Sequence, residues 1–309
     1  MEDKVLRYFQ LLEKLKQSKG YIISKKINLF SLSTYIFTEN YNQLINQIEL
    51  QTNPKGSQEI HSVENREKLR EVQIETLRFL HNFLASAQSL IDHTRVFVND
   101  LYDDNELFKK EFIKKIELTF TNDEVSTFIR NFRQYLQHFK APSISVVTNL
   151  LSKDRNYQRR VMISVSDLQQ FSGWKSLAKE YISKHDKNID LFLVSTTYFN
   201  KVNNFYKWFS EKQDSLHKSE FKEMENIKIE MTSANIKEII NDFIKNVNMS
   251  KEEFDLNITE VMTVMEKKAF LSFNQSSKFK YVLSICKKNK IQLDQKEILV
   301  LIKRYRTIK

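Results

Sequence analysis

The sequence predicts an all-α fold, mainly a helical bundle, with one inserted β-hairpin and a small C-terminal helical module. The 309 residues include only 3 Gly and 2 Pro, whereas folds with many tight turns use far more of both. Apolar residues recur at helical spacing over most of the chain. A strand-like alternation of apolar and polar residues is clear only at 143–165. These observations favour long helices with few sharp connections.

The first part of the chain is predicted to form long helices separated by short polar breaks. Residues 1–50 are expected to be helical, with a possible break at Ser18–Gly20. The segment from Gln51 to His61 is expected to be a loop, because it contains Pro54 and Gly56 among polar residues. The longest helical pattern follows at 62–102, and a second helix is expected at 106–120.

A third helix is expected to start near Asn122–Glu124 and to end by Lys140, because the residue before Pro142 avoids the helical conformation. The alternating segment comes next. Its outgoing strand carries Ile144, Val146 and Leu150, the turn is expected at 152–156, and the return strand carries Val161, Ile163 and Val165.

The remainder is predicted to be helical again. Ser166–Asp167 is expected to cap a helix that holds Trp174 and Tyr181, and another helix is expected from Ile189 to about Lys218. Its aromatic residues between 198 and 209 have helical spacing and are therefore expected to fill a core. Two domains are predicted, a bundle at 1–225 and a small basic helical module at 226–309.

Several classes of protein are excluded by the sequence. Its three glycines stand apart, so no Gly-rich phosphate loop exists. Cys286 is the only cysteine, which rules out an intrachain disulfide and a thiolate metal cluster and is typical of a reducing compartment. No HExxH zinc motif and no nucleophile elbow occur. The charged N-terminus and the absence of a long apolar run predict a cytoplasmic protein without a membrane span.

Positive charge is concentrated at the C-terminus. The chain has a net charge of +10, and residues 278–309 contain ten basic and two acidic residues, an excess of eight positive charges. Such a cluster favours nucleic acid or another polyanion. The alternative interpretation is an ordinary lysine-rich, solvated surface. The candidate nucleic-acid-binding residues are Lys287, Lys288, Lys290, Lys303, Arg304 and Arg306.

The helix around TFIRNFRQYLQHFKAP, residues 127–142, carries the first candidate site. Its apolar residues occupy one face, and Asn131, Gln134 and His138 follow at spacings of three and four on an adjacent face, flanked by Arg130 and Arg133. Arginine grips phosphate oxygens with two hydrogen bonds, and histidine titrates near neutral pH. This combination suits phosphodiester chemistry. The alternative is that His138 pairs with a core carboxylate and the arginines are solvated.

A second polar stripe lies on the helix at 62–102. Its members occur at spacings of four, three and four along an otherwise apolar helix, and they are Asn82, Ser86, Ser89 and His93. Because buried polar groups need partners, the stripe is predicted to face the helix that carries His138. The alternative is a close packing seam in which small residues let two helices approach.

The segment from Arg133 to His138 resembles the signature of the HEPN superfamily, an Arg followed by four to six residues and a His on a helix of a bundle. The strings FIRNFRQYLQHFKAPSI and HNFLASAQSLIDHTR also resemble uncharacterised bacterial HEPN-like proteins, and the resemblance covers about residues 65–142. It implies a metal-independent endoribonuclease of a toxin–antitoxin or antiviral-defence system that works as a homodimer. Gln134 departs from the pattern, in which a small polar or charged residue usually follows the Arg.

The resemblance implies that Arg133 binds the scissile phosphate and that His138 assists proton transfer or positions the RNA 2′-hydroxyl. Arg130, Asn131 and Gln134 would support them. No cofactor or metal is implied, and the expected partners are RNA, a second copy of the chain, and an antitoxin or defence-system protein, with no membrane. The alternative function is a non-catalytic HEPN-like adaptor that dimerises through the bundle and docks to nucleic acid or a protein.

Overall fold

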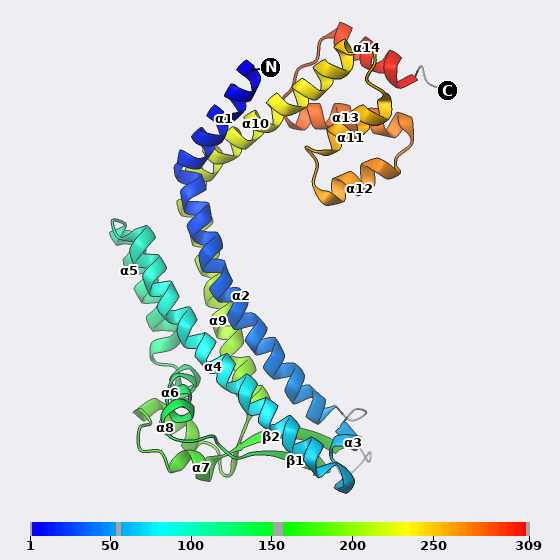
Figure 1. Cartoon of the computed structure of the whole chain (residues 1–309). Coiled ribbons are helices and arrows are strands. Elements are labelled where there is room, and N and C mark those ends of the chain that lie inside the picture. Colours follow the sequence, from blue (N-terminus) through cyan, green and yellow to red (C-terminus); the bar gives the residue numbers. More distant parts are fainter. Residues whose placement is uncertain (1, 54–56, 151–156, 307–309) are drawn as a thin grey trace. The chain divides into compact units, whose positions relative to one another are not determined.

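The computed structural model describes residues 2–53, 57–150 and 157–306 and confirms the predicted fold class, mainly helical with an inserted β-hairpin (Figure 1). The chain divides into two compact units. Residues 25–216 form one, called here the bundle unit, and residues 1–24 with 217–309 form the other, called the terminal unit. The predicted boundary at 225/226 falls inside an unbroken helix, α10 (Lys218–Lys245), and the first 24 residues group with the C-terminal part of the chain.

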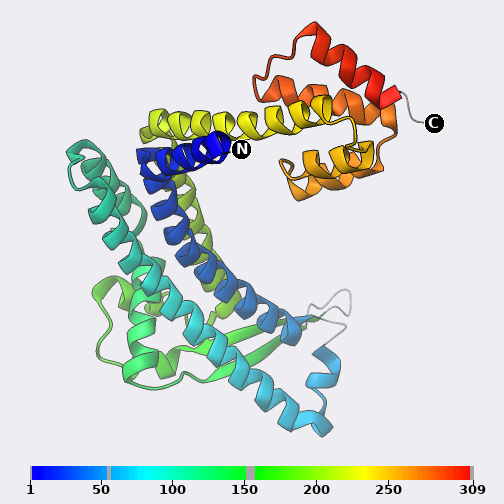
Figure 2. The ribbon, with the colours of Figure 1, turned by 45° about the horizontal axis from the view of Figure 1, so that its top comes forward.

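Three long helices form the body of the bundle unit, namely α2 (Lys19–Thr52) from residue 25 onward, α4 (Arg66–Tyr102) and α9 (Leu191–Leu216). They lie side by side (Figures 1 and 2). Phe30 of α2 stacks on Phe97 of α4 with ring centroids 4.6 Å apart, and both rings contact Phe209 of α9 edge-on. The aromatic residues of α9 therefore help to fill the core, as predicted.

Shorter elements complete the bundle unit. The helical ones are α3 (Ser57–Ile60), the 3₁₀ turn η1 (Val63–Asn65), α5 (Glu106–Ile116), the π-helical turn η2 (Glu117–Thr121), α6 (Glu124–His138), α7 (Val165–Gln169) and α8 (Ser176–Ser183). The break predicted at Ser18–Gly20 is confirmed by the end of α1 at Gln17, whereas the loop predicted at 51–61 is partly helical.

The β-hairpin is part of a three-stranded antiparallel sheet. Strand β1 (Ile144–Leu150) pairs with β2 (Tyr157–Ser164), with Ile144 opposite Ile163, and β2 also pairs with β3 (Asn188–Asp190), which the sequence did not predict. Val161 and Ile163 are fully buried, and β2 packs on α9. The predicted turn at 152–156 lies outside the described residues. Packing on helices explains how so small a sheet is stable.

One long helix predicted after the hairpin is instead two short ones. Trp174 lies in the connection between α7 and α8, where its indole N–H donates a hydrogen bond of 2.7 Å to the Leu168 carbonyl. Ser164, and not Ser166 or Asp167, caps α7, because its hydroxyl accepts from the Asp167 backbone N–H. The capping prediction was therefore wrong by two residues. Because Ser164 is the cap, the Asp167 carboxylate is available for another contact.

The terminal unit consists of α1 (Glu2–Gln17), the first turns of α2, α10, α11 (Lys251–Thr259), α12 (Val264–Ser272), α13 (Gln275–Lys288) and α14 (Gln295–Arg306). Leu15 of α1 packs on Met224 and Ile227 of α10. A Cβ at Gly20 would overlap the Glu220 backbone, so this close approach needs glycine. The last four helices and the end of α10 enclose a separate core around Phe243, Phe254 and other apolar residues. Within the described residues, no helix combines the length and apolar character that a bilayer span requires.

Candidate functional site

Helix α6 begins at a tightly held cap. The Asp123 carboxylate accepts hydrogen bonds from the backbone N–H and the hydroxyl of Ser126, at 2.8 and 2.7 Å. Lys201 of α9 pairs with the same carboxylate at 2.6 Å, and these contacts hold the pKa of Asp123 below its ordinary value even though burial opposes them. The next residue, Glu124, pairs with Lys184 at 2.5 Å. Both carboxylates at the start of α6 are therefore neutralised by lysines.

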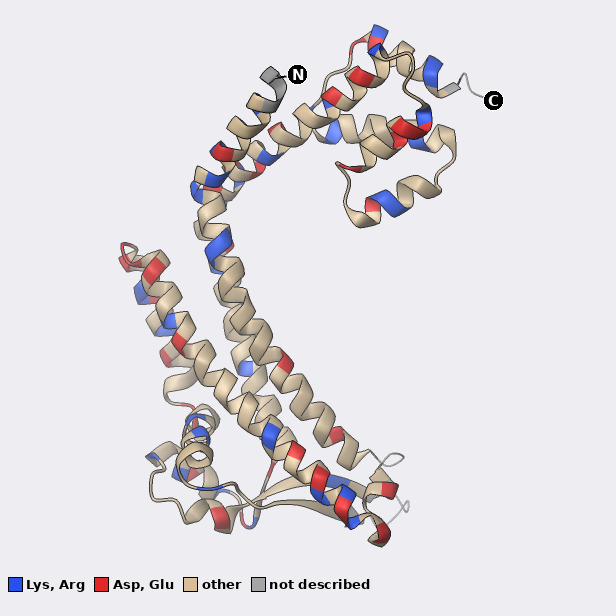
Figure 3. Cartoon of the chain, in the orientation of Figure 1, with Lys and Arg blue, Asp and Glu red and all other residues tan. Residues whose placement is uncertain are grey.

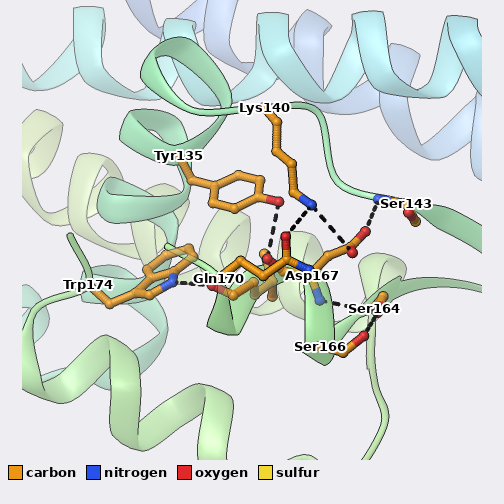
Figure 4. A network of polar contacts seen from close by, with 9 residues as sticks. Tyr135, Lys140, Ser143, Ser164, Ser166, Asp167, Gln170 and Trp174 are labelled. Carbon is orange, nitrogen blue, oxygen red and sulfur yellow. Dashed lines mark hydrogen bonds and ion pairs between the residues drawn. The ribbon is translucent and has the colours of Figure 1, made fainter. Parts of the chain in front are cut away.

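A polar network holds the C-terminal end of α6 (Figure 4). Asp167 of α7 accepts a hydrogen bond of 2.8 Å from the Ser143 backbone N–H and pairs with Lys140 at 3.5 Å. Lys140 also donates to Gln170 at 2.8 Å, and the Tyr135 hydroxyl donates to the Asp167 carbonyl at 3.4 Å. The Ser143 contact and Lys140 keep the pKa of Asp167 below its ordinary value. The network fixes where α6 stops and where the hairpin starts.

The apolar face of α6 packs into an aromatic cluster. Phe128, Phe132 and Tyr135 are fully buried and contact the Trp174 ring with centroid distances of 5.5, 6.5 and 5.7 Å. Together with the cap and the Asp167 network, this packing fixes the rotation of the helix about its axis. The opposite face is therefore held in one orientation.

That opposite face is exposed and carries the candidate catalytic residues. Arg130, Gln134, Gln137 and His138 are exposed, and Arg133 is half-buried. At about 100° and about 1.5 Å per residue, the Cα–Cβ directions of Arg133 and His138 diverge by about 140° and their positions lie about 7.5 Å apart along the axis. The two side chains therefore flank the exposed face and do not point to a single spot.

The contacts of these groups differ. Among the described residues, no group hydrogen-bonds or ion-pairs with the His138 ring, so the alternative of a core carboxylate partner is not what the structure has. The buried Nε–H of Arg133 lacks a hydrogen-bond acceptor within the described part of the chain. Arg130 donates only two long hydrogen bonds, both 3.4 Å, to the Ser126 carbonyl and the Thr127 hydroxyl. The guanidiniums are thus largely uncommitted.

Asn131 has a structural role, so its predicted supporting role at the site is corrected. It is 2% exposed, its side-chain oxygen accepts a hydrogen bond of 2.9 Å from the Lys175 backbone N–H, and its amide donates to Gln134 at 3.3 Å. Lys175 is the cap residue of α8. Asn131 therefore ties α6 to the start of α8, and its polar atoms are turned away from solvent.

The second polar stripe does not face α6, and that prediction was wrong. His93 contacts Ser33 of α2, with 2.7 Å between the ring Nδ1 and the hydroxyl, and the buried Ser86 hydroxyl donates to the Phe83 carbonyl of its own helix. Asn82 is half-buried and Ser89 is exposed. Ile91 of α4 lines a cavity together with Ser126 and Arg130 of α6, and it lies about 140° around the helix from Ser86. The residues of this stripe are therefore not placed to support His138.

The basic residues of the terminal unit are only partly available. The Arg304 guanidinium donates to the carbonyls of Asn246 and Met249, at 3.0 and 2.6 Å, and lies 4.1 Å from the Phe243 ring centre, so it clamps the loop after α10. This internal role corrects its assignment to nucleic-acid binding. Lys287, Lys288, Lys290 and Lys303 are exposed, and the Arg306 side chain lies outside the described residues. Figure 3 shows charges of both signs on these helices.

Alkaline pH is expected to destabilise the bundle unit. Burial raises the pKa of Tyr135, Tyr181 and Tyr198 to about 12, so the folded chain holds these protons more tightly than the unfolded chain, whose tyrosines titrate near the ordinary value of about 10. Their contribution to stability is complete below about pH 10 and declines as the pH rises toward about 12. Urea midpoints measured across this range, with tyrosinate absorbance as a second signal, check the decline. Tyr198→Phe should reduce it, and Tyr35→Phe, at an exposed position, should not.

No protein-family model, no curated protein and no solved structure matches this chain.

Proposed function

We propose that this chain binds RNA through the exposed face of α6 and, as a homodimer, cleaves it as a HEPN-like, metal-independent endoribonuclease of a toxin or antiviral-defence system. The observation that carries the proposal is the charge balance of α6. Between residues 125 and 138 the helix contains two arginines, a histidine and no carboxylate. The carboxylates of Asp123, Glu124 and Asp167 are each paired with a lysine. Arg130 and Arg133 form no ion pair within the described residues, so their charge is available to a phosphate.

The proposed reaction is an attack by the RNA 2′-hydroxyl on the neighbouring phosphorus. The bond from phosphorus to the 5′-oxygen breaks, which leaves a 2′,3′-cyclic phosphate and a 5′-hydroxyl. His138 would accept the proton of the 2′-hydroxyl while water protonates the leaving 5′-oxygen, or it would donate the proton to the 5′-oxygen while water accepts the proton of the 2′-hydroxyl. Arg133 would hold the non-bridging oxygens as negative charge grows on them.

The divergence of Arg133 and His138 supports a site shared by two copies of the chain. A two-fold axis beside α6 would bring His138 of one copy next to Arg133 of the other. Symmetry repeats this contact, so each dimer would have two such sites. The uncommitted Arg133 Nε–H is the kind of group that such a contact would satisfy.

Mixing two inactive variants tests the shared site. Wild-type protein, incubated with single-stranded RNA and a chelator, should yield cyclic phosphate ends, and the His138→Ala and Arg133→Ala chains should each fail. In a random mixture of the two, half the dimers are mixed and one of their two sites is intact, so activity should return to about a quarter of the wild-type level. No recovery, with both variants folded, would place the whole site in one chain.

A non-catalytic RNA-binding adaptor is the second candidate. The half-burial of Arg133 favours it, because a guanidinium whose Nε–H is already enclosed presents less of its fork to a phosphate. RNA binding by the wild-type protein without any cleavage, under the conditions of the mixing experiment, would select this alternative.

The basic end of α13 is expected to contribute to RNA affinity. Deleting residues 278–309 would not test this, because Val282, Ile285 and Leu301 belong to the core of the terminal unit. Reversing two exposed charges, Lys287→Glu with Lys290→Glu, should weaken binding and flatten its salt dependence by about 1.4 in the slope of log K against log salt, if both lysines contact phosphates of a single strand. The matched pair on α12, Lys267→Glu with Lys268→Glu, should change the slope less. Equal effects of the two pairs would mean that α13 makes no phosphate contact.

A further inference from the structure

A cavity in the bundle unit lies between α4, α5, η2, α6 and α9. The centre of a water-sized sphere can occupy about 100 Å³ of it, within a hollow of about 670 Å³ that includes open solvent at the mouth. Most of its wall is hydrocarbon and aromatic, with Phe112, Phe120 and Phe205 among the lining residues. Unfilled apolar space inside a domain forfeits packing contacts and lowers stability. A ligand with an apolar body would restore those contacts.

The polar groups of the cavity gather at α6 and α9. Tyr198 lines the cavity, is 2% exposed, and its hydroxyl has no hydrogen-bond partner among the described residues. Arg130 lines the same cavity and is close enough to Tyr198 for its charge to act on that phenol. The other phenol of the wall belongs to the half-buried Tyr206 and already shares a hydrogen bond of 2.5 Å with the Thr94 hydroxyl. The donors available to a ligand in the cavity are therefore the Tyr198 phenol and the remaining N–H groups of the Arg130 guanidinium.

The chemistry of these donors specifies the ligand. A phenol O–H and the fork of a guanidinium both donate hydrogen bonds, and the guanidinium carries a positive charge. Arg130 uses two of its five N–H donors, both in 3.4 Å hydrogen bonds that a stronger acceptor would displace. A carboxylate fits this pair because it accepts two parallel hydrogen bonds from an arginine. Arg95, the other cation of the wall, is already paired with Asp92 at 3.3 Å.

We propose that this cavity is a binding site for a hydrophobic carboxylate, a medium-chain fatty acid in chemical class, with the tail among the phenylalanines and the head group on Arg130 and Tyr198. The proposal does not rest on RNA cleavage, because it is argued from the cavity and from the donors that line it, although Arg130 belongs both to this cavity and to the exposed face of α6. Neither Arg133 nor His138 lines the cavity.

Calorimetry on the full chain tests the proposal with a set of probes, each kept below its micelle concentration. Decanoate should bind at least tenfold more tightly than decanol, and decyltrimethylammonium should not bind. Decanoate should also raise the thermal midpoint of unfolding, because a ligand that binds only the folded state stabilises it. Hexanoate and tetradecanoate establish the preferred length. Equal binding of decanol and decanoate, or no binding of any carboxylate, would overturn the proposal.

Two variants locate the site. Arg130→Ala should weaken decanoate binding at least tenfold while leaving decanol unaffected, and Arg130→Lys should recover part of the loss. Arg78→Ala, at an exposed arginine outside the cavity, is the matched control. Val202→Phe places a ring in the cavity and should abolish binding of every probe. If a folded Val202→Phe protein still binds decanoate, the ligand occupies another place and the assignment is wrong. If Val202→Phe does not fold, the Arg130 series still decides.

Discussion

Replacing His138 with alanine is expected to lower the rate of RNA cleavage by about 10²–10⁴-fold, the usual contribution of a general acid or base. The thermal midpoint should not change, because the His138 side chain is exposed and has no hydrogen-bond partner among the described residues. Cleavage is followed as the release of 2′,3′-cyclic phosphate ends with chelator present, and folding by circular dichroism. If His138→Ala loses both its activity and its fold, the result gives no support for a role of His138 in the reaction.

His81→Ala is the matched control for this variant. His81 is also an exposed histidine of the bundle unit, but it belongs to α4 and not to α6, so its removal should leave cleavage unchanged. Arg133→Lys keeps the charge but loses the planar fork and should also be impaired. If His138→Ala cuts RNA as fast as the wild type, a contaminating nuclease is the simplest source of the activity, and the adaptor becomes the preferred function.

Replacing Asp255 with alanine is expected to destabilise the core of the terminal unit by about 3–5 kcal/mol, the usual cost of removing one partner from a buried ion pair. The Asp255 and Lys278 side chains are 8% and 16% exposed, and the charged atoms lie 2.7 Å apart. The second carboxylate oxygen accepts a hydrogen bond of 2.7 Å from the Tyr305 hydroxyl. The variant leaves an ammonium and a phenol enclosed without their acceptor.

Urea unfolding, with a signal from the terminal unit, measures this effect. The double variant Asp255→Leu with Lys278→Met removes both charges and should recover most of the loss, because an apolar pair of similar volume has no desolvation penalty. Glu225→Ala, which breaks an exposed pair with Lys228 on α10, should have almost no effect. A small effect of Asp255→Ala, equal to that of Glu225→Ala, would show that water reaches the Lys278 ammonium in the folded chain.

Much of the fold could be predicted from local sequence, because helix periodicity and turn residues act over a few positions. The break at Ser18–Gly20, the end of α6 before Pro142 and the paired strands at 144–150 and 157–164 all follow from such signals. The division of the connection around Trp174 into two helices was not predictable in this way. It depends on contacts of Trp174 with Leu168 and with the α6 aromatics, which are distant in sequence or absent from any local pattern.

The candidate site, too, was predictable only in the features that depend on local sequence. The sequence by itself determined that α6 has an apolar face and a polar face, since 3.6-residue periodicity needs no information from other elements. The tertiary structure decided what each polar residue does. Asn131 and His138 are seven residues apart and so lie near the same face of the helix. Asn131 is nevertheless buried and accepts a hydrogen bond from the Lys175 backbone, whereas His138 is exposed. Lys278 and Lys287 both belong to the basic C-terminal segment, but Lys278 forms a largely buried ion pair with Asp255. The reason is physical: a polar side chain is available to a ligand only if no other part of the chain satisfies it, and the partners here come from elements far away in sequence.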